Sequence, residues 1–330
     1  MTNNKIKILI TGGAGFIGTN LTKALLKQKQ SVFCIDNLND YYSPNIKKKN
    51  IEQFETNPNY KFQKLDIENL DDLKKLFSKQ TFDVVVHLAA RAGVRASIEN
   101  PSNYIQTNIH GTLNLLECIK NLSSHLGKNG RDKNIKKFIF ASSSSVYGNI
   151  KKVPFKEDMN INTPISPYAA TKLSCEAICY TYHHLYNINM VGLRLFTVYG
   201  PHNRPDMAAY KFTKAIIENQ NIEMYGDGNT SRDYTYIDDI VSGIIKSIDL
   251  ENNFEIINLG NSSPIKLKSF IQTFEKVIGK KANIIKKPIP IGDVMQTYAD
   301  ISKAKELLNW EPKISLREGL SKLIKWYRNK

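Results

Sequence analysis

Short apolar runs alternate with segments of helical periodicity from the start of the chain to about residue 150. Apolar runs of this length that are bounded by turns are typical of strands buried on both faces. Short buried strands that alternate with helices predict a Rossmann-type α/β fold, a doubly wound parallel sheet with helices on both faces. The expected strands are 6–10, 31–36, 60–65, 84–88 and 137–141, and the expected helices are 16–27, 70–77 and 101–121.

The pattern becomes less regular after Gly200, where residues 201–207 are rich in turn formers. Short strands mix with helices over the last hundred residues, and one helix is expected over 301–308. We therefore expect two domains. The first covers residues 1–190 and is rejoined by segments near 191–200 and 233–260. The second is a smaller, interleaved C-terminal lobe over residues 201–330.

A glycine-rich turn joins the first expected strand to the first expected helix. Its glycines follow the spacing G-x-x-G-x-x-G, and such a turn is informative only between a strand and a helix, which is the context found here. Backbone N–H groups at a helix N-terminus can hold a pyrophosphate. The turn therefore predicts a dinucleotide site that includes Gly12, Gly15, Phe16, Ile17 and Gly18.

Asp36 ends the second expected strand, downstream of the glycine turn. A carboxylate at this place can accept hydrogen bonds from both hydroxyls of an adenine ribose and would repel a 2′-phosphate. No arginine occurs at positions 37–41, so the sequence favours NAD over NADP. A solvated aspartate at a strand end is the alternative interpretation. The remaining expected cofactor contacts are Asn37, Asp66, Ile67, Leu88, Ala89, Ala90 and Asn108.

Tyr168 and Lys172 are four residues apart, which places them on one face of a helix. Ser166 is suited to the N-cap and Pro167 to the first helical position, so Tyr168 falls in the first turn. The positive end of the helix dipole and the neighbouring ammonium both favour a phenolate. The pair therefore predicts a general base that acts beside the dinucleotide.

Four serines, residues 142–145, follow the fifth expected strand at its carboxyl end. In open α/β sheets, ligands bind at this end of the strands. A serine here can form a hydrogen bond with a sugar hydroxyl that Tyr168 deprotonates. A polar loop of turn-forming serines is the alternative.

The net charge of +15 raises the question of nucleic acid, but the basic residues do not support such a partner. Only eight of the 46 basic residues are arginines, and runs such as Lys47-Lys48-Lys49 have no interleaved aromatic residues. Nucleic-acid sites usually show basic residues clustered on one face. We therefore interpret these lysines as a solvated surface and expect no nucleic-acid partner.

No apolar run has the length of about 18 residues that a transmembrane helix needs, so no membrane association is expected. The first seven residues lead almost directly into an apolar strand and leave no room for a signal peptide. These features predict a cytoplasmic protein. The four cysteines lack accompanying histidine or cysteine ligands, so no metal site is predicted.

Taken together, these motifs resemble the extended short-chain dehydrogenase/reductase family, from Thr11 to Trp310. Within it the resemblance is strongest to the nucleotide-sugar epimerases that act on UDP-glucuronate. This narrower resemblance depends on five segments, 36–42, 92–95, 194–201, 204–207 and 232–239.

The resemblance implies an isomerase that epimerises a UDP-sugar at C4 through a transient 4-keto sugar, with no net redox change. It implies that Tyr168 is the catalytic base, that Lys172 positions the nicotinamide ribose, and that Ser143 is the catalytic serine of the family. The most specific expectation is conversion of UDP-glucuronate to UDP-galacturonate, in polysaccharide biosynthesis.

Departures from the sequences of sister families narrow the choice of reaction type. Related dehydratases and decarboxylases carry an acidic residue after the fifth strand, where this chain has serines, so epimerisation is favoured. Thr197 stands where galactose-type epimerases have asparagine, and with Ser144 and Ser145 it offers hydroxyls to a sugar carboxylate. Arg204 and Arg232 resemble ligands of the UDP moiety, and Arg95 fits either the substrate or a structural ion pair equally well.

Three alternatives remain open. The first is a 4-epimerase for UDP-glucose or UDP-N-acetylglucosamine, the second a dinucleotide-sensing regulator without catalysis, and the third a nucleic-acid binder. The resemblance also implies a homodimer with a four-helix interface, built from the helix that starts at Pro101 and the helix of Tyr168. The residues expected near that interface are Leu116, Cys118, Tyr180 and His184.

Overall fold

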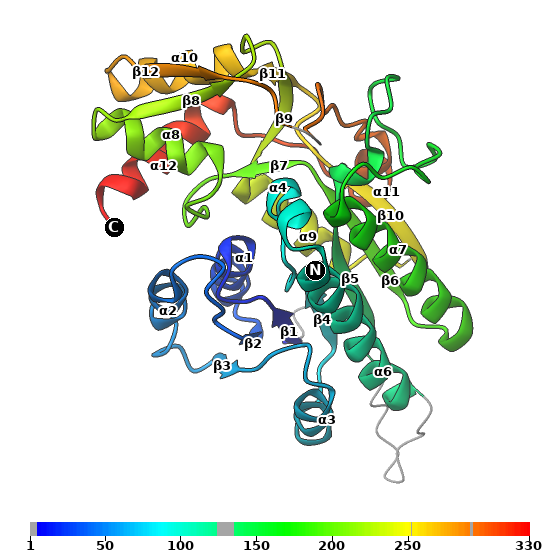
Figure 1. The fold of residues 1–330 in the computed structure, drawn as a ribbon. Helices are drawn as coiled ribbons and strands as arrows, with labels where there is room; N and C mark the ends of the chain where they lie inside the picture. The colour runs from blue at the N-terminus through cyan, green and yellow to red at the C-terminus, as the bar shows by residue number, and fades with distance from the viewer. Residues whose placement is uncertain (1–4, 124–134, 252, 291–292) are drawn as a thin grey trace.

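The computed structural model describes residues 5–123, 135–251, 253–290 and 293–330. Its largest element is a parallel seven-stranded sheet with the strand order β10-β6-β5-β4-β1-β2-β3 (Figure 1). The order reverses direction between β1 and β4, which makes the sheet doubly wound and confirms the predicted fold class. The strands are β1 (Lys7–Thr11), β2 (Ser31–Asp36), β3 (Tyr60–Lys64), β4 (Val84–His87), β5 (Lys137–Ser143), β6 (Met190–Leu195) and β10 (Phe254–Leu259).

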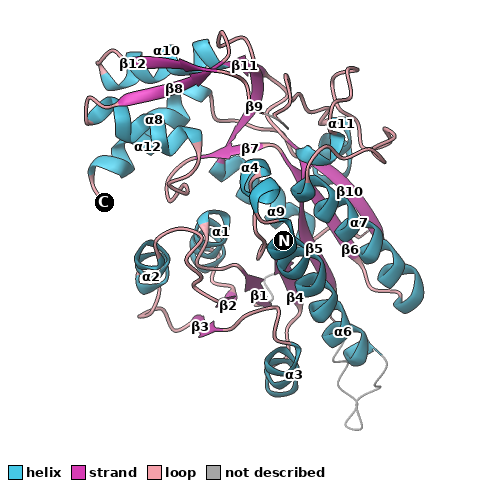
Figure 2. Cartoon of the chain, viewed as in Figure 1, coloured by secondary structure: helices cyan, strands magenta, loops and turns pink. Residues whose placement is uncertain are grey.

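Both faces of this sheet are apolar, because successive side chains of a strand point to opposite faces. Ile8 and Ile10 of β1 belong to one hydrophobic cluster, while Leu9 between them belongs to a second. Helices cover both faces (Figure 2). The first cluster includes residues of α1 (Phe16–Lys27), α9 (Ile237–Ile248) and α11 (Ser302–Leu308), and the second includes residues of α3 (Leu70–Lys79), α6 (Gly111–Ser123) and α7 (Pro167–Tyr186).

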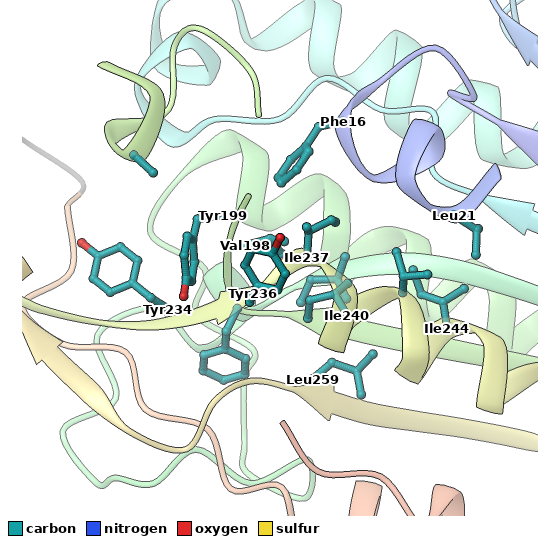
Figure 3. Close-up of a cluster of buried hydrophobic side chains, with 14 of the residues drawn as sticks. Phe16, Leu21, Val198, Tyr199, Tyr234, Tyr236, Ile237, Ile240, Ile244 and Leu259 are labelled. Atoms are coloured by element: carbon teal, nitrogen blue, oxygen red, sulfur yellow. The ribbon is translucent and has the colours of Figure 1, made fainter. Parts of the chain in front are cut away.

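A close-up of the first cluster shows how α1 and α9 are held together (Figure 3). Leu21 of α1 lies near Ile244 of α9, Ile240 lies one turn earlier on α9, and all three side chains are fully buried. Phe16, the first residue of α1, lies on the side of this cluster towards Val198. The glycine turn therefore leads directly into a helix that buried apolar contacts hold in place.

The smaller lobe lies beyond the carboxyl ends of the sheet strands and contains two further sheets. In one, β9 pairs in parallel with β7 and antiparallel with β11, and in the other β8 pairs in parallel with β12. The exact division of the chain into two domains stays a prediction. The elements here are β7 (Thr197–Tyr199), α8 (Ala208–Ile217), β8 (Asn221–Tyr225), β9 (Ser231–Tyr236), β11 (Pro264–Lys266), α10 (Leu267–Ile278), β12 (Asn283–Lys287) and α12 (Leu316–Arg328).

The helix expected over 101–121 is present but is not uniformly α-helical. It runs through α5 (Pro101–Tyr104), a π-helical segment (Ile105–His110) and α6, and the Pro at its start suits the first helical position. π-helical segments often occur at functional sites. The remaining helices are α2 (Pro44–Glu52) and α4 (Val94–Glu99).

Among the described residues, no helix is both long enough and apolar enough to cross a membrane.

Candidate active site

A cavity of about 1440 Å³ lies at the carboxyl ends of the sheet strands, between the sheet and the smaller lobe. Its wall includes the residue after β1, the last residue of β2 and the last residue of β5, which are Gly12, Asp36 and Ser143. A site for one small molecule usually measures about 300–1,000 Å³. The cavity therefore has room for two ligands of nucleotide size.

The glycine turn forms one end of this cavity. Gly12 has a φ of +71°, and a Cβ atom there would lie 2.7 Å from the backbone nitrogen of Ala89. A Cβ on Gly18 would lie 2.3 Å from the carbonyl oxygen of Gly12. Only glycine fits these positions. No side chain caps the N-terminus of α1, so its first N–H groups are available to an anion.

Asp36 is buried beside the turn, with its carboxylate held in place by the backbone. One oxygen accepts a hydrogen bond from the Leu38 N–H at 2.8 Å, and the other accepts from the Ala14 N–H at 3.2 Å. Burial raises the pKa of Asp36, while the nearby Lys47 ammonium opposes that shift. The fixed carboxylate keeps unused lone pairs that can accept from ribose hydroxyls.

The expected cofactor residues line this one cavity, with a single exception. Asn108 is buried behind the wall and does not line the cavity. Its side-chain oxygen accepts from the Arg91 N–H at 2.8 Å, and its amide donates to the Arg91 carbonyl oxygen and to the Thr171 hydroxyl, both at 3.0 Å. Asn108 therefore braces the wall through both amide protons and one lone pair of its side-chain oxygen, and its expected contact with the cofactor stays a prediction.

Tyr168 and Lys172 lie on the first turns of α7 and both line the cavity. The structure confirms Ser166 as the N-cap, where its hydroxyl accepts from the Ala169 N–H at 3.2 Å, and Pro167 as the first helical residue. The Lys172 ammonium donates to the carbonyl oxygen of Ala141 at 2.7 Å. This contact fixes the charge of Lys172 between α7 and the end of β5.

Ser143, the last residue of β5, also lines the cavity. Its hydroxyl oxygen accepts from the Ser145 N–H at 3.1 Å and lies 3.2 Å from the Ser145 hydroxyl. This bond caps a short 3₁₀ helix, Ser144–Tyr147. Ser144 and Ser145 of this turn line the same cavity, as does Thr197, the first residue of β7.

The three arginines expected to contact substrate all line the cavity, but they differ in their partners. Arg204 forms a bidentate pair with Asp206, at 2.9 and 2.6 Å. Arg95 donates to Asp293 at 2.8 Å. Arg232 donates only to the Ser231 carbonyl oxygen among the interactions of the described residues, and no carboxylate pairs with it. Burial lowers the pKa of Arg232, and the charges of Tyr234 and Asp293 oppose this shift only in part.

Arg194, which contributed to the family resemblance, has a structural role. It forms a buried, bidentate pair with Glu176 of α7 at 2.9 and 2.8 Å and donates to the Tyr147 hydroxyl at 2.9 Å. Glu176 also accepts from the Ser142 hydroxyl at 2.5 Å. The pair connects β6, α7 and the end of β5, directly behind the catalytic candidates.

Lys47 and Arg91 line the cavity but were not predicted from the sequence. The interpretation of Lys47-Lys48-Lys49 as surface lysines is wrong for Lys47, which is 5% exposed and donates to the side-chain and backbone oxygens of Asn39 at 2.7 and 3.0 Å. Lys47 lies on the face of α2 that also buries Asn50 and Ile51. The i, i+3, i+4 spacing of these residues was the available signal.

Among the described residues, no group of three or more histidine, cysteine or carboxylate side chains is arranged to hold a metal ion. The four cysteines of the chain are free and buried.

Comparisons with known proteins agree with this geometry. Residues 9–323 match the sequence model of the family described as GDP-mannose 4,6 dehydratase. A UDP-glucuronate 4-epimerase of Thermodesulfobacterium geofontis is 47% identical over 319 residues, which cover 96% of this chain and 95% of that protein.

Two solved structures share the whole fold. The UDP-glucuronic acid 4-epimerase of Bacillus cereus, solved with UDP-glucuronic acid and NAD, is 40% identical with a TM-score of 0.89 and covers 98% of this chain and 99% of that chain. The UDP-glucose 4-epimerase of Thermotoga maritima, solved with UDP-glucose, is 32% identical with a TM-score of 0.88 at the same coverage. The chain therefore belongs to the GDP-mannose 4,6 dehydratase family, among the nucleotide-sugar epimerases of the extended short-chain dehydrogenase/reductase type.

Proposed function

We propose that this chain is an isomerase that epimerises a UDP-sugar at C4 with bound NAD, and that its substrate is UDP-glucuronate. The observation that carries the proposal is that Tyr168, Lys172 and Ser143 share one cavity with the glycine turn. A binding protein needs the turn, but it has no need of a tyrosine–lysine pair beside it.

The residues present fit NAD. The positions that only glycine can occupy leave the N-terminus of α1 open to a diphosphate, and the fixed Asp36 carboxylate suits a ribose diol. Bound NAD supplies the hydride acceptor and donor for sugar C4. The solved relative with UDP-glucuronic acid and NAD supports this pairing of cofactor and substrate.

The chain's own groups manage the proton and the geometry. Tyr168 takes the proton of the sugar 4-hydroxyl and later returns it, as a general base and then a general acid. The Lys172 ammonium, fixed on the Ala141 carbonyl oxygen, places a positive charge one helical turn from Tyr168 and donates to the ribose of the cofactor. The Ser143 hydroxyl, oriented by the Ser145 N–H, forms a hydrogen bond with the same sugar oxygen.

Substrate recognition divides between two groups of residues. Arg232, which pairs with no carboxylate of the described residues, provides a positive charge for the UDP diphosphate. The hydroxyls of Ser144, Ser145 and Thr197 provide hydrogen bonds to the C5 carboxylate of a uronic acid. A neutral UDP-sugar is the second candidate, because the UDP-glucose 4-epimerase of Thermotoga maritima shares the fold.

Nuclear magnetic resonance spectroscopy of the purified protein with UDP-glucuronate tests the proposal, with UDP-glucose and UDP-N-acetylglucosamine in parallel. The appearance of UDP-galacturonate without loss of carbon dioxide and without added NAD supports both reaction and cofactor. Tyr168→Phe is expected to remove turnover and keep NAD. Turnover of a neutral sugar alone contradicts the uronate assignment, and a chain that converts no UDP-sugar even with added NAD contradicts the reaction.

We also propose a homodimer, formed by a four-helix contact of α6 and α7 with their copies. Tyr180 is 56% exposed on α7 and His184 is exposed one turn further on, so both are available to a partner. Leu116 and Cys118 were also expected near that interface. Both are buried within the single chain, and their place near the interface stays a prediction. Light scattering that gives the mass of one chain would contradict the dimer. A cytoplasmic location, a role in polysaccharide biosynthesis and the lack of a nucleic-acid partner stay predictions.

A further inference from the structure

The Asn203 side chain is the least satisfied polar group of the cavity wall. It is 1% exposed and lines the cavity, yet neither its amide nitrogen nor its side-chain carbonyl oxygen has a hydrogen-bond partner among the described residues. A buried polar atom without a partner costs about 1–3 kcal/mol, so such groups are rare unless a ligand completes them. Asn203 contributes two such atoms at one point of the wall.

The loop that carries Asn203 is attached to the glycine turn. The Asn20 amide of α1 donates to the Pro201 carbonyl oxygen at 3.0 Å and to the Phe16 carbonyl oxygen at 2.9 Å. Asn203 itself lies in a tight turn in which its N–H donates to Gly200 at 3.2 Å. The loop that follows β7 is thus held against the first turn of α1.

His202, the residue before Asn203, makes a second connection between this loop and the cofactor end of the cavity. The His202 ring lies 2.8 Å from the side-chain oxygen of Asn50, and the Asn50 amide donates to the Ala14 carbonyl oxygen at 3.0 Å. Ala14 in turn donates its N–H to Asp36. The position of Asn203 is therefore set by the residues that shape the cofactor end of the cavity.

We propose that Asn203 binds the cofactor at the junction of its diphosphate and ribose. The argument rests on hydrogen-bond complementarity. The amide nitrogen of Asn203 needs a hydrogen-bond acceptor, and a phosphate oxygen is one. The carbonyl oxygen of its side chain needs a donor, and because a diphosphate has none, the adjoining ribose hydroxyl provides it. A dinucleotide whose diphosphate lies at the N-terminus of α1 brings both groups to the loop that Asn20 holds against that helix.

This assignment gives the cofactor a contact from the segment after β7, in addition to its contacts with β1, β2 and α1. An epimerase must return hydride to the same sugar and so must keep its cofactor through each cycle. Asn203 contributes to that retention. The inference rests on the proposed use of NAD.

The experiment compares wild type, Asn203→Ala and Asn203→Asp for the NAD retained after gel filtration and for the free NAD that gives half-maximal activity. Loss of a hydrogen bond to a charged group predicts an increase of about 10- to 100-fold in the NAD concentration that gives half-maximal activity of Asn203→Ala. The aspartate, nearly isosteric but anionic, is expected to weaken binding more, because it repels the diphosphate. The KM for UDP-glucuronate at saturating NAD is expected to stay within about twofold.

Two further measurements separate a ligand contact from a structural role. The melting temperature of the NAD-free alanine variant is expected to equal or exceed that of NAD-free wild type, because an unsatisfied amide has been removed. Asn20→Ala loosens the same loop and leaves the amide in place, so it is expected to weaken NAD binding less than Asn203→Ala.

Three results would overturn the inference. They are unchanged NAD affinity in both Asn203 variants, an increase in the KM for the sugar alone, and a loss of NAD in Asn20→Ala as large as that in Asn203→Ala. In each of these cases wild type still binds NAD and the proposed function stands. A wild-type chain that neither retains nor binds NAD would overturn both.

Discussion

The Lys172 ammonium forms a 2.7 Å hydrogen bond with the carbonyl oxygen of Ala141. This bond joins α7 to β5 and holds a buried cation one helical turn from Tyr168, at the carboxyl edge of the sheet. Of the three ammonium protons, it uses one, so the others remain available to ligands in the cavity. Both the position and the charge of Lys172 therefore bear on the reaction.

Replacement of Lys172 by alanine is expected to lower kcat by about 100-fold or more, because general-base catalysis by Tyr168 loses the positive charge that is fixed one helical turn away. NAD retention is expected to fall as well, through loss of the contact to ribose. Steady-state kinetics and the NAD content of the purified variant measure the two effects. The exposed Lys151 provides the matched control, since Lys151→Ala is expected to change neither. A Lys172→Ala enzyme with wild-type kcat would contradict the role of the pair.

Replacement of Arg232 by methionine is expected to raise the KM for the UDP-sugar by about 10- to 100-fold and to leave kcat within a few-fold. The reason is that Arg232 forms no ion pair with a carboxylate in the part of the chain that the structure describes, so its charge can pair with the diphosphate. A hydrogen bond to a charged group is worth about 1.5–3 kcal/mol. Kinetics with varied UDP-sugar measure the change. Arg317→Met, at an exposed arginine of α12, is the control. A decrease in kcat at unchanged KM would assign Arg232 to the chemical step instead.

The buried pair of Glu176 and Arg194 is expected to dominate the stability of the region behind the site. Glu176→Gln leaves the Arg194 guanidinium buried without its counter-charge, which costs about 3–5 kcal/mol. Urea unfolding of the NAD-free protein measures the loss. The double variant Glu176→Leu with Arg194→Met removes both charges and is expected to lose less than Glu176→Gln. A loss below about 1 kcal/mol in Glu176→Gln would show that the pair is not desolvated.

The fold and most of the candidate site could be predicted from the sequence because they depend on local patterns. The alternation of apolar runs with helices indicated the sheet, and the strand–turn–helix context of Gly12 and Gly18 indicated the dinucleotide end. Ser166 and Pro167 marked the start of α7 correctly, because capping depends on neighbouring residues alone.

What the sequence did not reveal depends on contacts between distant segments. The sequence indicates a surface position for Lys47, but the fold places its ammonium near the Asp36 carboxylate. The sequence indicates a cofactor contact for Asn108, but in the fold its side-chain amide binds Arg91 and Thr171. Leu116 was expected on a dimer surface, but the chain's own core covers it. For Asn108 and Leu116 no periodicity distinguishes these outcomes, since each is decided by the partner that the fold supplies.

His87 is expected to make the protein less stable in mild acid. It lies between the hydroxyls of Thr11 and Thr112, and burial, with a smaller effect of Lys172, lowers its pKa to about 3. The unfolded chain has a histidine pKa of about 6.5, so between these values the unfolded state binds one more proton. The contribution of His87 to the free energy of unfolding is therefore fully present above about pH 6.5 and is lost as the pH falls. The loss amounts to about 2 kcal/mol between pH 7.5 and pH 5.

Urea unfolding at a series of pH values tests this contribution. His87→Gln keeps a polar group between the two threonines but cannot titrate. Between pH 4 and pH 6, the slope of its free energy of unfolding against pH is therefore expected to be smaller than that of wild type by the equivalent of about one bound proton. Its absolute stability at pH 7.5 is expected to be lower, because the ring packing is lost. Equal pH slopes for wild type and variant would mean that His87 is not held neutral in the folded protein.

Thr197→Val is expected to shift the substrate preference from UDP-glucuronate towards UDP-glucose. The two side chains have nearly the same shape, and only the hydroxyl is lost, so the cavity keeps its volume while a charged C5 group loses a donor. The ratio of the two kcat/KM values is expected to change by about 10-fold, almost wholly through UDP-glucuronate. Thr197→Ser, which keeps the hydroxyl, is the control and is expected to retain the preference. If valine lowers both kcat/KM values equally, Thr197 supports the reaction in general and does not recognise the carboxylate.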